Sequence, residues 1–216
     1  MLNEVLNDIN SNMTWRLNEL REFKNIANKL NDYQAKILLK SLIPMVYAHW
    51  EGFIVSTMKI VFQYLNQLNL RSDDYCYIYL TTAYENSLSN LEKSTNFDKR
   101  KKHLKNLYDN FSKQVQFNDK IDTKSNLKFD VLTEICKKIN LDESNFLGYK
   151  EDLNMLVHIR NGIAHGDTES IVFENYEAVE KYIDLLENLM IDFVNQIQIL
   201  LEKEKFKKED NNDESI

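Results

Sequence analysis

Three polar side chains that lie close together in the sequence could act on a phosphodiester. They belong to the run Arg160-Asn161-Gly162-Ile163-Ala164-His165. A histidine can transfer a proton near neutral pH, and an arginine can hold a phosphate through two hydrogen bonds and stabilise developing charge. An asparagine can orient either the histidine or a phosphate oxygen. These residue types therefore fit proton-transfer chemistry at a phosphate.

The spacing brings these side chains together if the segment is a helix. Asn161 and His165 are four residues apart and share one face. Arg160 and His165 are separated by about 140° around the axis and about 7.5 Å along it, which a long arginine can bridge. His165 would lie in the last turn, where the helix dipole favours a cation. The alternative is a purely structural role, because Arg and His also suit helix ends and Asn-Gly favours turns.

The elements that position this run must be helices. The 216 residues include only four Gly and one Pro, whereas a β-sandwich or a Rossmann-type fold needs many more turn residues. Hydrophobic residues make up 43% of the chain and charged residues 28%, which is ordinary globular composition. We therefore predict an all-α fold, an antiparallel bundle of about six to seven helices.

Apolar residues recur at helical spacing along most of the chain. Asn31-Asp32 is a break and a candidate N-cap, Pro44 should kink its helix or mark its first turn, and Gly166 is a natural helix stop. The Tyr-rich segment 75–79 has a short strand as its alternative, and polar residues 118–126 are expected to form a loop. The predicted helices cover residues 2–30, 33–69, 72–91, 97–117, 129–139, 149–165 and 174–205.

We expect one helical domain over residues 1–206, with 93–140 as a candidate insertion, and a disordered charged tail over 207–216. The chain opens without the pattern of a signal peptide, and no window is apolar enough to span a membrane. Cys76 and Cys136 lie far apart and outside any metal-binding motif. We therefore expect a cytoplasmic protein with reduced thiols, no metal, no cofactor and no membrane partner.

Charge is unevenly distributed along the chain. The formal net charge is -7, yet residues 93–138 hold 12 Lys or Arg against 6 Asp or Glu. The densest basic run is Lys99-Arg100-Lys101-Lys102-His103, followed by Lys105, and its first four residues are the candidate RNA-binding residues. Clustered positive charge of this kind can bind RNA phosphates. The alternative is a helix face that is simply solvated.

The motif residues resemble those of a known superfamily. Arg160-Asn161-x3-His165 resembles the Arg-x4-6-His signature of the HEPN superfamily, with the favoured Asn directly after the Arg. The segment Ala48-His49-Trp50-Glu51-Gly52-Phe53 resembles the Trp/Phe-Glu-Gly-Phe element of prokaryotic HEPN toxins and abortive-infection proteins. The likeness covers about residues 30–200 of a chain that reads as all-α.

This resemblance implies a homodimer in which two copies of the motif face each other and form one composite site. It also implies a metal-independent endoribonuclease, in which the RNA 2′-hydroxyl attacks the adjacent phosphate and leaves a 2′,3′-cyclic phosphate and a 5′-hydroxyl. His165 would be the general acid or base, Arg160 the phosphate clamp and Asn161 a positioning group. Such a protein would be a toxin or phage-defence effector that acts on RNA, with an antitoxin or a co-encoded defence protein as candidate partner.

Glu51 would support this site. A carboxylate in an apolar helix is costly unless it is paired, and Arg160 or His49 is the candidate partner. The alternative is a carboxylate that faces solvent or caps a neighbouring helix. Some HEPN toxins carry a tyrosine two residues after the histidine, which their partner modifies with a nucleotide. Asp167 occupies that position here, so this regulation is not expected.

Two rival functions are consistent with the same residues. The chain could be a non-catalytic HEPN interaction module that scaffolds a partner protein. It could also be an unrelated helical bundle in which Arg160 and His165 only cap a helix. The oligomeric state discriminates these possibilities, since the last of them requires no dimer.

Overall fold

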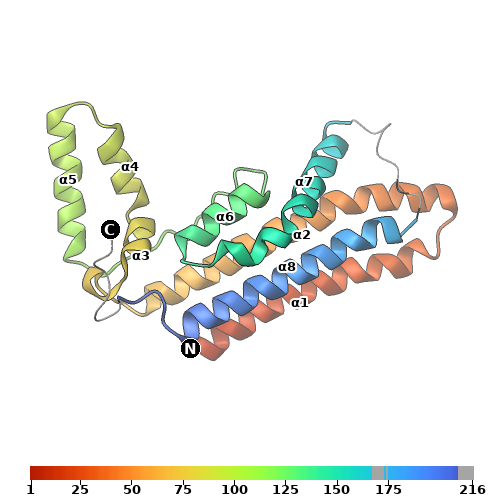
Figure 1. Cartoon of the computed structure of the whole chain (residues 1–216), viewed down its shortest axis with the longest axis horizontal. Coiled ribbons are helices and arrows are strands. Elements are labelled where there is room, and N and C mark those ends of the chain that lie inside the picture. Colours follow the sequence, from red (N-terminus) through yellow and green to blue (C-terminus); the bar gives the residue numbers. More distant parts are fainter. Residues whose placement is uncertain (167–172, 174, 209–216) are drawn as a thin grey trace.

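The structure is a computed structural model of the chain and describes residues 1–166, 173 and 175–208. Within these ranges every regular element is a helix, and β-pairing is limited to isolated bridges. The predicted all-α fold is therefore confirmed (Figure 1). The helices are α1 (Leu2–Ala27), α2 (Asp32–Gln67), α3 (Tyr77–Ala83), α4 (Glu85–Lys93), α5 (Phe97–Phe111), α6 (Phe129–Lys138), α7 (Lys150–Ala164) and α8 (Glu177–Glu202), with 3-10 helices η1 (Ser72–Asp74) and η2 (Glu143–Tyr149).

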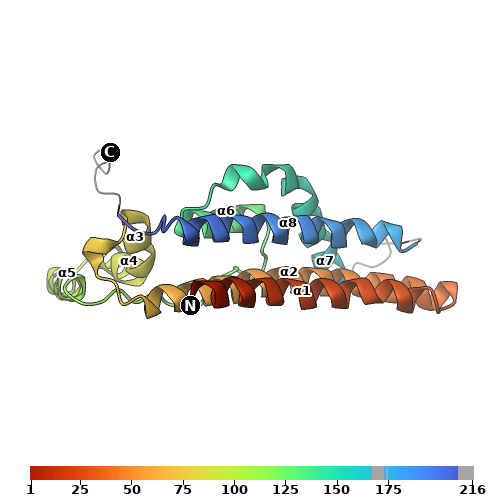
Figure 2. The same cartoon turned by 90° about the horizontal axis from the view of Figure 1, so that it is seen from below.

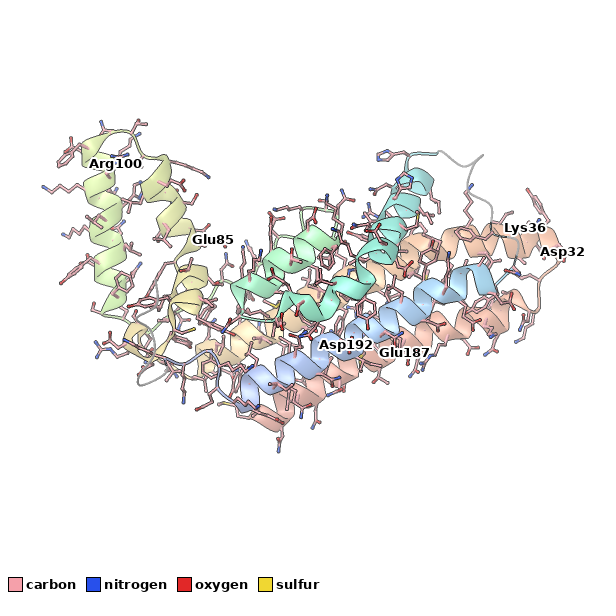
Figure 3. The ribbon with its side chains drawn as sticks, in the orientation of Figure 1. Asp32, Lys36, Glu85, Arg100, Glu187 and Asp192 are labelled. Carbon is pink, nitrogen blue, oxygen red and sulfur yellow. The ribbon has the colours of Figure 1, made fainter. Side chains whose placement is uncertain are left out.

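Three long helices make the body of the molecule. α1 runs antiparallel to both α2 and α8, and Figure 2 shows α1 and α2 in one layer with α8 over them. The ion pair between Arg21 and Glu187 bridges α1 and α8 at the surface; Figure 3 labels Glu187. α2 is buried on most sides because α1, α7 and α8 all pack against it. The contact with α7 joins the central helix to the helix that carries the candidate motif.

Local sequence signals set the ends of the helices that matter here. Asn31 caps α2 by accepting a hydrogen bond from the Gln34 backbone at 3.0 Å, and the Gln34 side chain accepts one in return. α2 continues through Pro44, which lies well inside the helix and does not mark its first turn. Gly166 has a φ of 79°, the left-handed conformation of a residue just after a helix end. α7 therefore stops at the end of the motif, as predicted.

The single helix predicted over residues 72–91 is wrong, and so is the alternative strand over 75–79. Residues 72–74 form η1, and α3 and α4 are separate helices that meet at Tyr84. The buried hydroxyls of Ser72 and Tyr84 are hydrogen-bonded at 3.0 Å, which fixes this bend. Tyr75 and Tyr79 turn inward, where their rings contact that of Phe117. The packing of these tyrosines against a distant phenylalanine thus prevails over the local preference for one continuous helix.

The helix predicted over 97–117 ends earlier, at Phe111. The following segment leaves the helix so that Val115 and Phe117 can enter the core. The Asn66 side chain accepts a hydrogen bond from the Phe117 N–H at 2.7 Å and donates one to its carbonyl oxygen at 3.1 Å. This double contact holds the segment against α2. The non-helical conformation of this segment depends on Asn66, a side chain 51 residues away, and local helix propensity does not reveal such a contact.

The other predicted helices differ from the observed ones only at their ends. The predicted loop over 118–126 is also present and contains no helix. The disordered tail is predicted to begin at residue 207, directly after the buried Phe206. Lys208 still contacts the body of the molecule, because its N–H donates to the Asp74 carbonyl oxygen at 2.9 Å. Residues 209–216 and Asp167 lie outside the described residues. In the described ranges, no helix is long and apolar enough to cross a membrane.

Candidate active site at the end of α7

The last turn of α7 carries the predicted motif. Leu153, Leu156 and Val157 are buried, so they fix which face of α7 turns inward. Arg160 and Asn161 are half-buried, whereas His165 is exposed. The His165 N–H donates to the Asn161 carbonyl oxygen at 2.9 Å, which places the histidine at the closing turn. The helical arrangement expected for the motif is therefore present.

The Arg160 guanidinium is held from three sides. Its central carbon lies 4.1 Å from the centroid of the Tyr47 ring on α2. One terminal nitrogen donates to the Asn161 side-chain oxygen at 2.7 Å, and the other lies 3.4 Å from the Ser125 carbonyl oxygen. A guanidinium has five N–H donors, so three are left for an anion such as a phosphate. The arginine is therefore oriented before any ligand arrives.

Residues 123–127, which we name the strap, precede α6 and bridge α2 and α7 through hydrogen bonds next to Arg160. The Thr123 hydroxyl donates to Glu51 at 2.5 Å, and the Leu127 N–H donates to the Tyr47 hydroxyl at 2.7 Å. On the other side, the Asn161 amide donates to the Asn126 side-chain oxygen at 3.1 Å. The strap therefore touches Arg160 and Asn161 while it is anchored on the central helix.

Two backbone features shape the strap. Lys124 and Ser125 both have positive φ, 53° and 57°, which non-glycine residues seldom adopt. The Trp50 indole N–H donates to the Leu127 carbonyl oxygen at 3.3 Å, and Trp50 itself is fully buried. Strained conformations persist only where surrounding contacts enforce them. The contacts with α2 and α7 supply that enforcement.

The partner expected for Glu51 was wrong. Glu51 accepts its hydrogen bond from Thr123, and no ion pair joins it to Arg160 or His49 within the described part of the chain. Positions 49 and 51 differ by about 200° around the helix, so they face opposite sides of α2. Glu51 nevertheless lies beside the motif, because it holds the strap that contacts Arg160.

His49 belongs to a separate cluster between α1 and α2. Its Nε2 lies 3.4 Å from a Glu19 carboxylate oxygen, and its ring meets Trp15 edge-on at 5.5 Å. Gly52 allows the Arg16 guanidinium to approach closely, because an added Cβ would lie only 2.8 Å from its Nη1. The Trp50-Glu51-Gly52 run thus contacts α1 on one side and the strap on the other.

Burial raises the pKa of the Tyr47 phenol, and the Glu51 carboxylate adds to the increase, while the Leu127 hydrogen bond and Arg160 oppose it. Tyr47 is therefore neutral at physiological pH, with its ring against a cation. Such a contact contributes roughly 0.5–2 kcal/mol, more when it is shielded from water. The arrangement favours an Arg160 that stays charged and in place.

The structure separates the basic run from the motif. Lys99, Arg100, Lys101 and Lys102 lie on α5, which projects at one end of the molecule, well away from the last turn of α7 (Figure 1); Figure 3 labels Arg100. All four are exposed. Arg100 donates through Nε to the Ser94 carbonyl oxygen at 2.6 Å, so part of its guanidinium secures the turn before α5.

The sequence patterns indicated Arg160, Asn161 and His165 but not Tyr47 or the strap. Tyr47 precedes Glu51 by four residues, so the shared face was a usable signal. The strap residues stand in a polar loop and carry no such signal. In the described ranges, no three His, Cys, Asp or Glu side chains gather as metal ligands.

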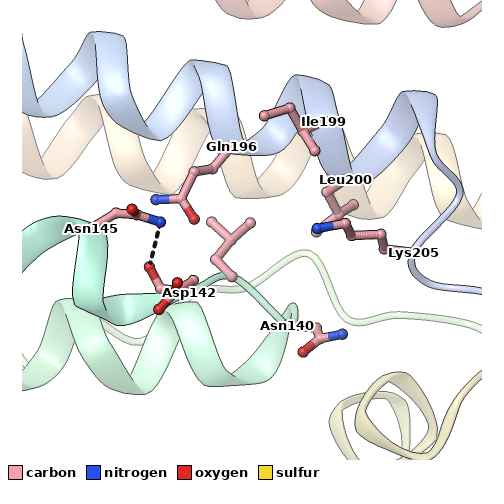
Figure 4. Close-up of a pocket in the computed structure, with 8 residues that line it drawn as sticks. Asn140, Asp142, Asn145, Gln196, Ile199, Leu200 and Lys205 are labelled. Carbon is pink, nitrogen blue, oxygen red and sulfur yellow. Dashed lines mark hydrogen bonds between the residues drawn. The ribbon is translucent and has the colours of Figure 1, made fainter.

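A separate cavity lies between α8 and the segment that links α6 to η2 (Figure 4). Asn145 donates there to the Asp142 carbonyl oxygen at 3.3 Å, and Gln196 and Lys205 also line the cavity. None of the motif residues borders this space. It is therefore distinct from the candidate active site.

An all-α bundle with Arg, Asn and His at the end of one helix, linked through the strap to a Trp-Glu-Gly element on the central helix, defines a HEPN-type module. The sequence model of the RiboL-PSP-HEPN family matches residues 11–198, and the chain belongs to this family. The comparison with curated proteins gives no match, and neither does the comparison with solved structures.

Proposed function

We propose that this chain is a metal-independent endoribonuclease of the HEPN type that acts as a toxin or phage-defence effector. The observation that carries the proposal is the contrast between Arg160 and His165. Arg160 is oriented by Tyr47, Asn161 and the strap, whereas His165 is exposed and its side chain makes no hydrogen bond or ion pair within the described residues. A fixed cation and an available proton carrier at the same helix end suit phosphodiester cleavage.

The chemistry requires two proton transfers. One histidine would take the proton of the RNA 2′-hydroxyl as the 2′-oxygen bonds to phosphorus. The bond from phosphorus to the 5′-oxygen then breaks, and a second histidine would give that oxygen a proton. The products are a 2′,3′-cyclic phosphate and a 5′-hydroxyl. Arg160 would stabilise the charge that develops on the phosphate oxygens.

A homodimer would supply the second histidine. Each chain carries one His165, and two-fold symmetry would bring two copies of the same surface together. Exposed apolar side chains on the helices around the motif support this arrangement: Met155 on α7, and Tyr33 and Ile37 on α2. Covering them would remove apolar surface from water. We propose that these residues belong to the dimer interface.

The direct test is cleavage of RNA by the purified protein and by His165→Ala, with EDTA present. His158→Ala is the matched control, because His158 is also exposed on α7 but lies outside the motif. We expect His165→Ala to cleave at least about 100-fold more slowly, and His158→Ala to resemble the wild type. Cyclic-phosphate ends should appear only with the active proteins.

Equal cleavage by all three proteins would mean that another site or a contaminant is responsible. If no RNA is cleaved by any of them, the non-catalytic interaction module becomes the better explanation. Equal loss of activity in His158→Ala and His165→Ala would instead indicate a general disturbance of α7 and would contradict a specific role for His165.

A further inference from the structure

α4 and α5 form an arm that projects from one end of the body (Figures 1 and 2). α5 packs chiefly against α4, where Leu107 is its only buried residue. The Tyr84 and Phe111 rings meet edge-on at 5.0 Å near the base of the arm. Asn96 caps α5 by accepting from the Asp98 and Lys99 N–H groups. The arm is thus a defined pair of helices whose outer surface is open.

The outer surface of α5 carries an aromatic stripe. Phe97, Leu104, Tyr108 and Phe111 follow one another at intervals of seven, four and three residues, which places them on one helix face. Their exposed fractions are 78%, 56%, 76% and 42%. A helix that only needed to fold would bury such a face. Phe97 and Tyr108 are the most exposed of the four.

Uncompensated positive charge borders this stripe. Lys101 follows Phe97 by four residues and Lys105 follows Lys101 by four, so both lie along one edge of the stripe. Neither Lys101 nor Lys105 has a carboxylate partner among the described residues, and the same holds for Lys99 and Lys102. The lysines of the strap and of the α6 region differ in this respect. Each of them is paired with a carboxylate: Lys124, Lys128, Lys137 and Lys138.

We propose that the α4–α5 arm binds single-stranded RNA. Bases would stack on Phe97 and Tyr108, which are about 16 Å apart along the helix axis, and phosphates would lie against Lys101 and Lys105. Unpaired bases have free π-faces and stack on aromatic side chains without regard to sequence, whereas bases in a duplex do not. This inference rests on the proposed function only for its choice of RNA as the ligand.

The same observations argue against the nearest alternative, pairing between the arms of two copies. That contact would bring Lys101 and Lys105 of one chain close to the same lysines of another, and like charges across an interface are costly. An RNA strand instead satisfies both the cations and the aromatic faces. The arm would select single-stranded RNA and hold it. Because the arm is remote from α7, the motif would act on another part of the same RNA strand.

The test measures binding by the full chain carrying His165→Ala, so that cleavage does not interfere. The probe is a labelled single-stranded RNA of about 12 nucleotides, within the range one binding module covers, compared with the same strand annealed to its complement. We expect Phe97→Ala and Tyr108→Ala each to weaken single-strand binding roughly 5- to 150-fold. Leu104→Ala is the matched control, since it lies in the same stripe but has no ring, and it should bind as before.

Lys101→Gln and Lys105→Gln test the electrostatic half of the proposal. Each lost phosphate contact should reduce the slope of log affinity against log salt concentration by about 0.7 for a single strand. All these side chains are exposed, so circular dichroism and thermal melting of the variants should match the parent protein. Equal binding of duplex and single strand would overturn the stacking proposal.

Three further results would also overturn it. Equal losses of RNA affinity in Leu104→Ala and Tyr108→Ala would mean that the stripe does not act through stacking on aromatic rings. A change in sedimentation of the RNA-free protein with Tyr108→Ala would indicate a contact between copies. Wild-type affinity in every arm variant would remove the arm from RNA binding, even if the wild type cleaves RNA. Conversely, binding through the arm by a protein that cleaves nothing would overturn the proposed function alone.

Discussion

Arg160 on α7 lies over the ring of Tyr47 on α2, with the guanidinium carbon 4.1 Å from the centroid of the ring. The contact joins the central helix to the motif helix at the site that we propose binds phosphate. Tyr47 is almost fully buried, so its ring cannot turn away without disturbing the core. Tyr47 is therefore a positioning residue that acts through Arg160.

Replacing Tyr47 separates the role of its ring from that of its hydroxyl. Tyr47→Leu removes the aromatic face, and losing a contact of about 0.5–2 kcal/mol should reduce kcat/KM for RNA cleavage roughly 2- to 30-fold. Tyr47→Phe keeps the ring and loses the hydrogen bond from the Leu127 N–H, so it should melt at a lower temperature but cleave better than Tyr47→Leu. Comparable kcat/KM values for the two variants would contradict the positioning role.

The strap offers an independent test of the same arrangement. Thr123→Val keeps the shape of the side chain but removes the hydroxyl that donates to Glu51. We expect it to lower the rate of RNA cleavage more than the melting temperature, because the strap also contacts Arg160. Thr133→Val is the control, since the Thr133 hydroxyl bonds only to a carbonyl of its own helix. Equal effects of the two substitutions on cleavage would argue that the strap plays no part.

Trp50 connects the core to the strap, and its substitution should act on stability. Trp50→Phe leaves the buried Leu127 carbonyl oxygen without the indole N–H and opens space in the core. The expected loss is roughly 1–3 kcal/mol in the free energy of unfolding, from the unsatisfied acceptor together with the reduced packing. Urea denaturation measures this difference. A change below about 0.5 kcal/mol, typical of surface positions, would mean that the contact contributes little.

Burial lowers the pKa of His49, Glu19 offsets part of this decrease, and Arg16 adds to it. The Glu19 contact uses Nε2, and the buried Nδ1 has no hydrogen-bond partner among the described residues, so protonation would bury an N–H at Nδ1 without an acceptor. The folded-state pKa lies below the unfolded value of about 6.5. As the pH falls below that value, the unfolded chain therefore takes up the proton first, and stability decreases.

The pH dependence can be assigned with a substitution. The free energy of unfolding should fall as the pH drops below about 6.5 and should level off once His49 is also protonated in the folded state. His49→Gln should make this part of the curve flatter, whereas His158→Ala, at an exposed position on α7, should leave it unchanged. Identical curves for wild type and His49→Gln would assign the pH dependence to other groups.

The fold could be predicted from composition and periodicity because helices are local structures. The Asn31 cap and the Gly166 stop are short-range signals, and both operate as expected. The errors cluster between residues 72 and 117, where distant contacts decide the result. α3 ends at Ala83, before Tyr84, whose hydroxyl is hydrogen-bonded to that of Ser72. α5 ends at Phe111, and Phe117 lies outside the helix because the Asn66 side chain binds its backbone.

The candidate site was predictable to the extent that it lies within one helix. Arg160, Asn161 and His165 lie within six consecutive residues at one helix end, so their place in one site follows from spacing. Tyr47 and Asn126 reach Arg160 and Asn161 from sequence positions 113 and 35 residues away. Hydrogen bonds and ring contacts between such distant segments leave no periodic trace in the sequence.

The composite-site proposal makes the activity depend on association. The wild type should sediment at twice the chain mass of 25.7 kDa, and its specific activity should rise with protein concentration until the dimer is complete. Met155→Asp should weaken dimer formation and lower the specific activity, because it puts a charge into an interface that is expected to be apolar. Ile199→Asp, a similarly exposed position on α8, is the control and should change neither. Full activity in a protein that remains monomeric would mean that one chain supplies both proton carriers, and the second would then have to be sought near His165 in the same copy.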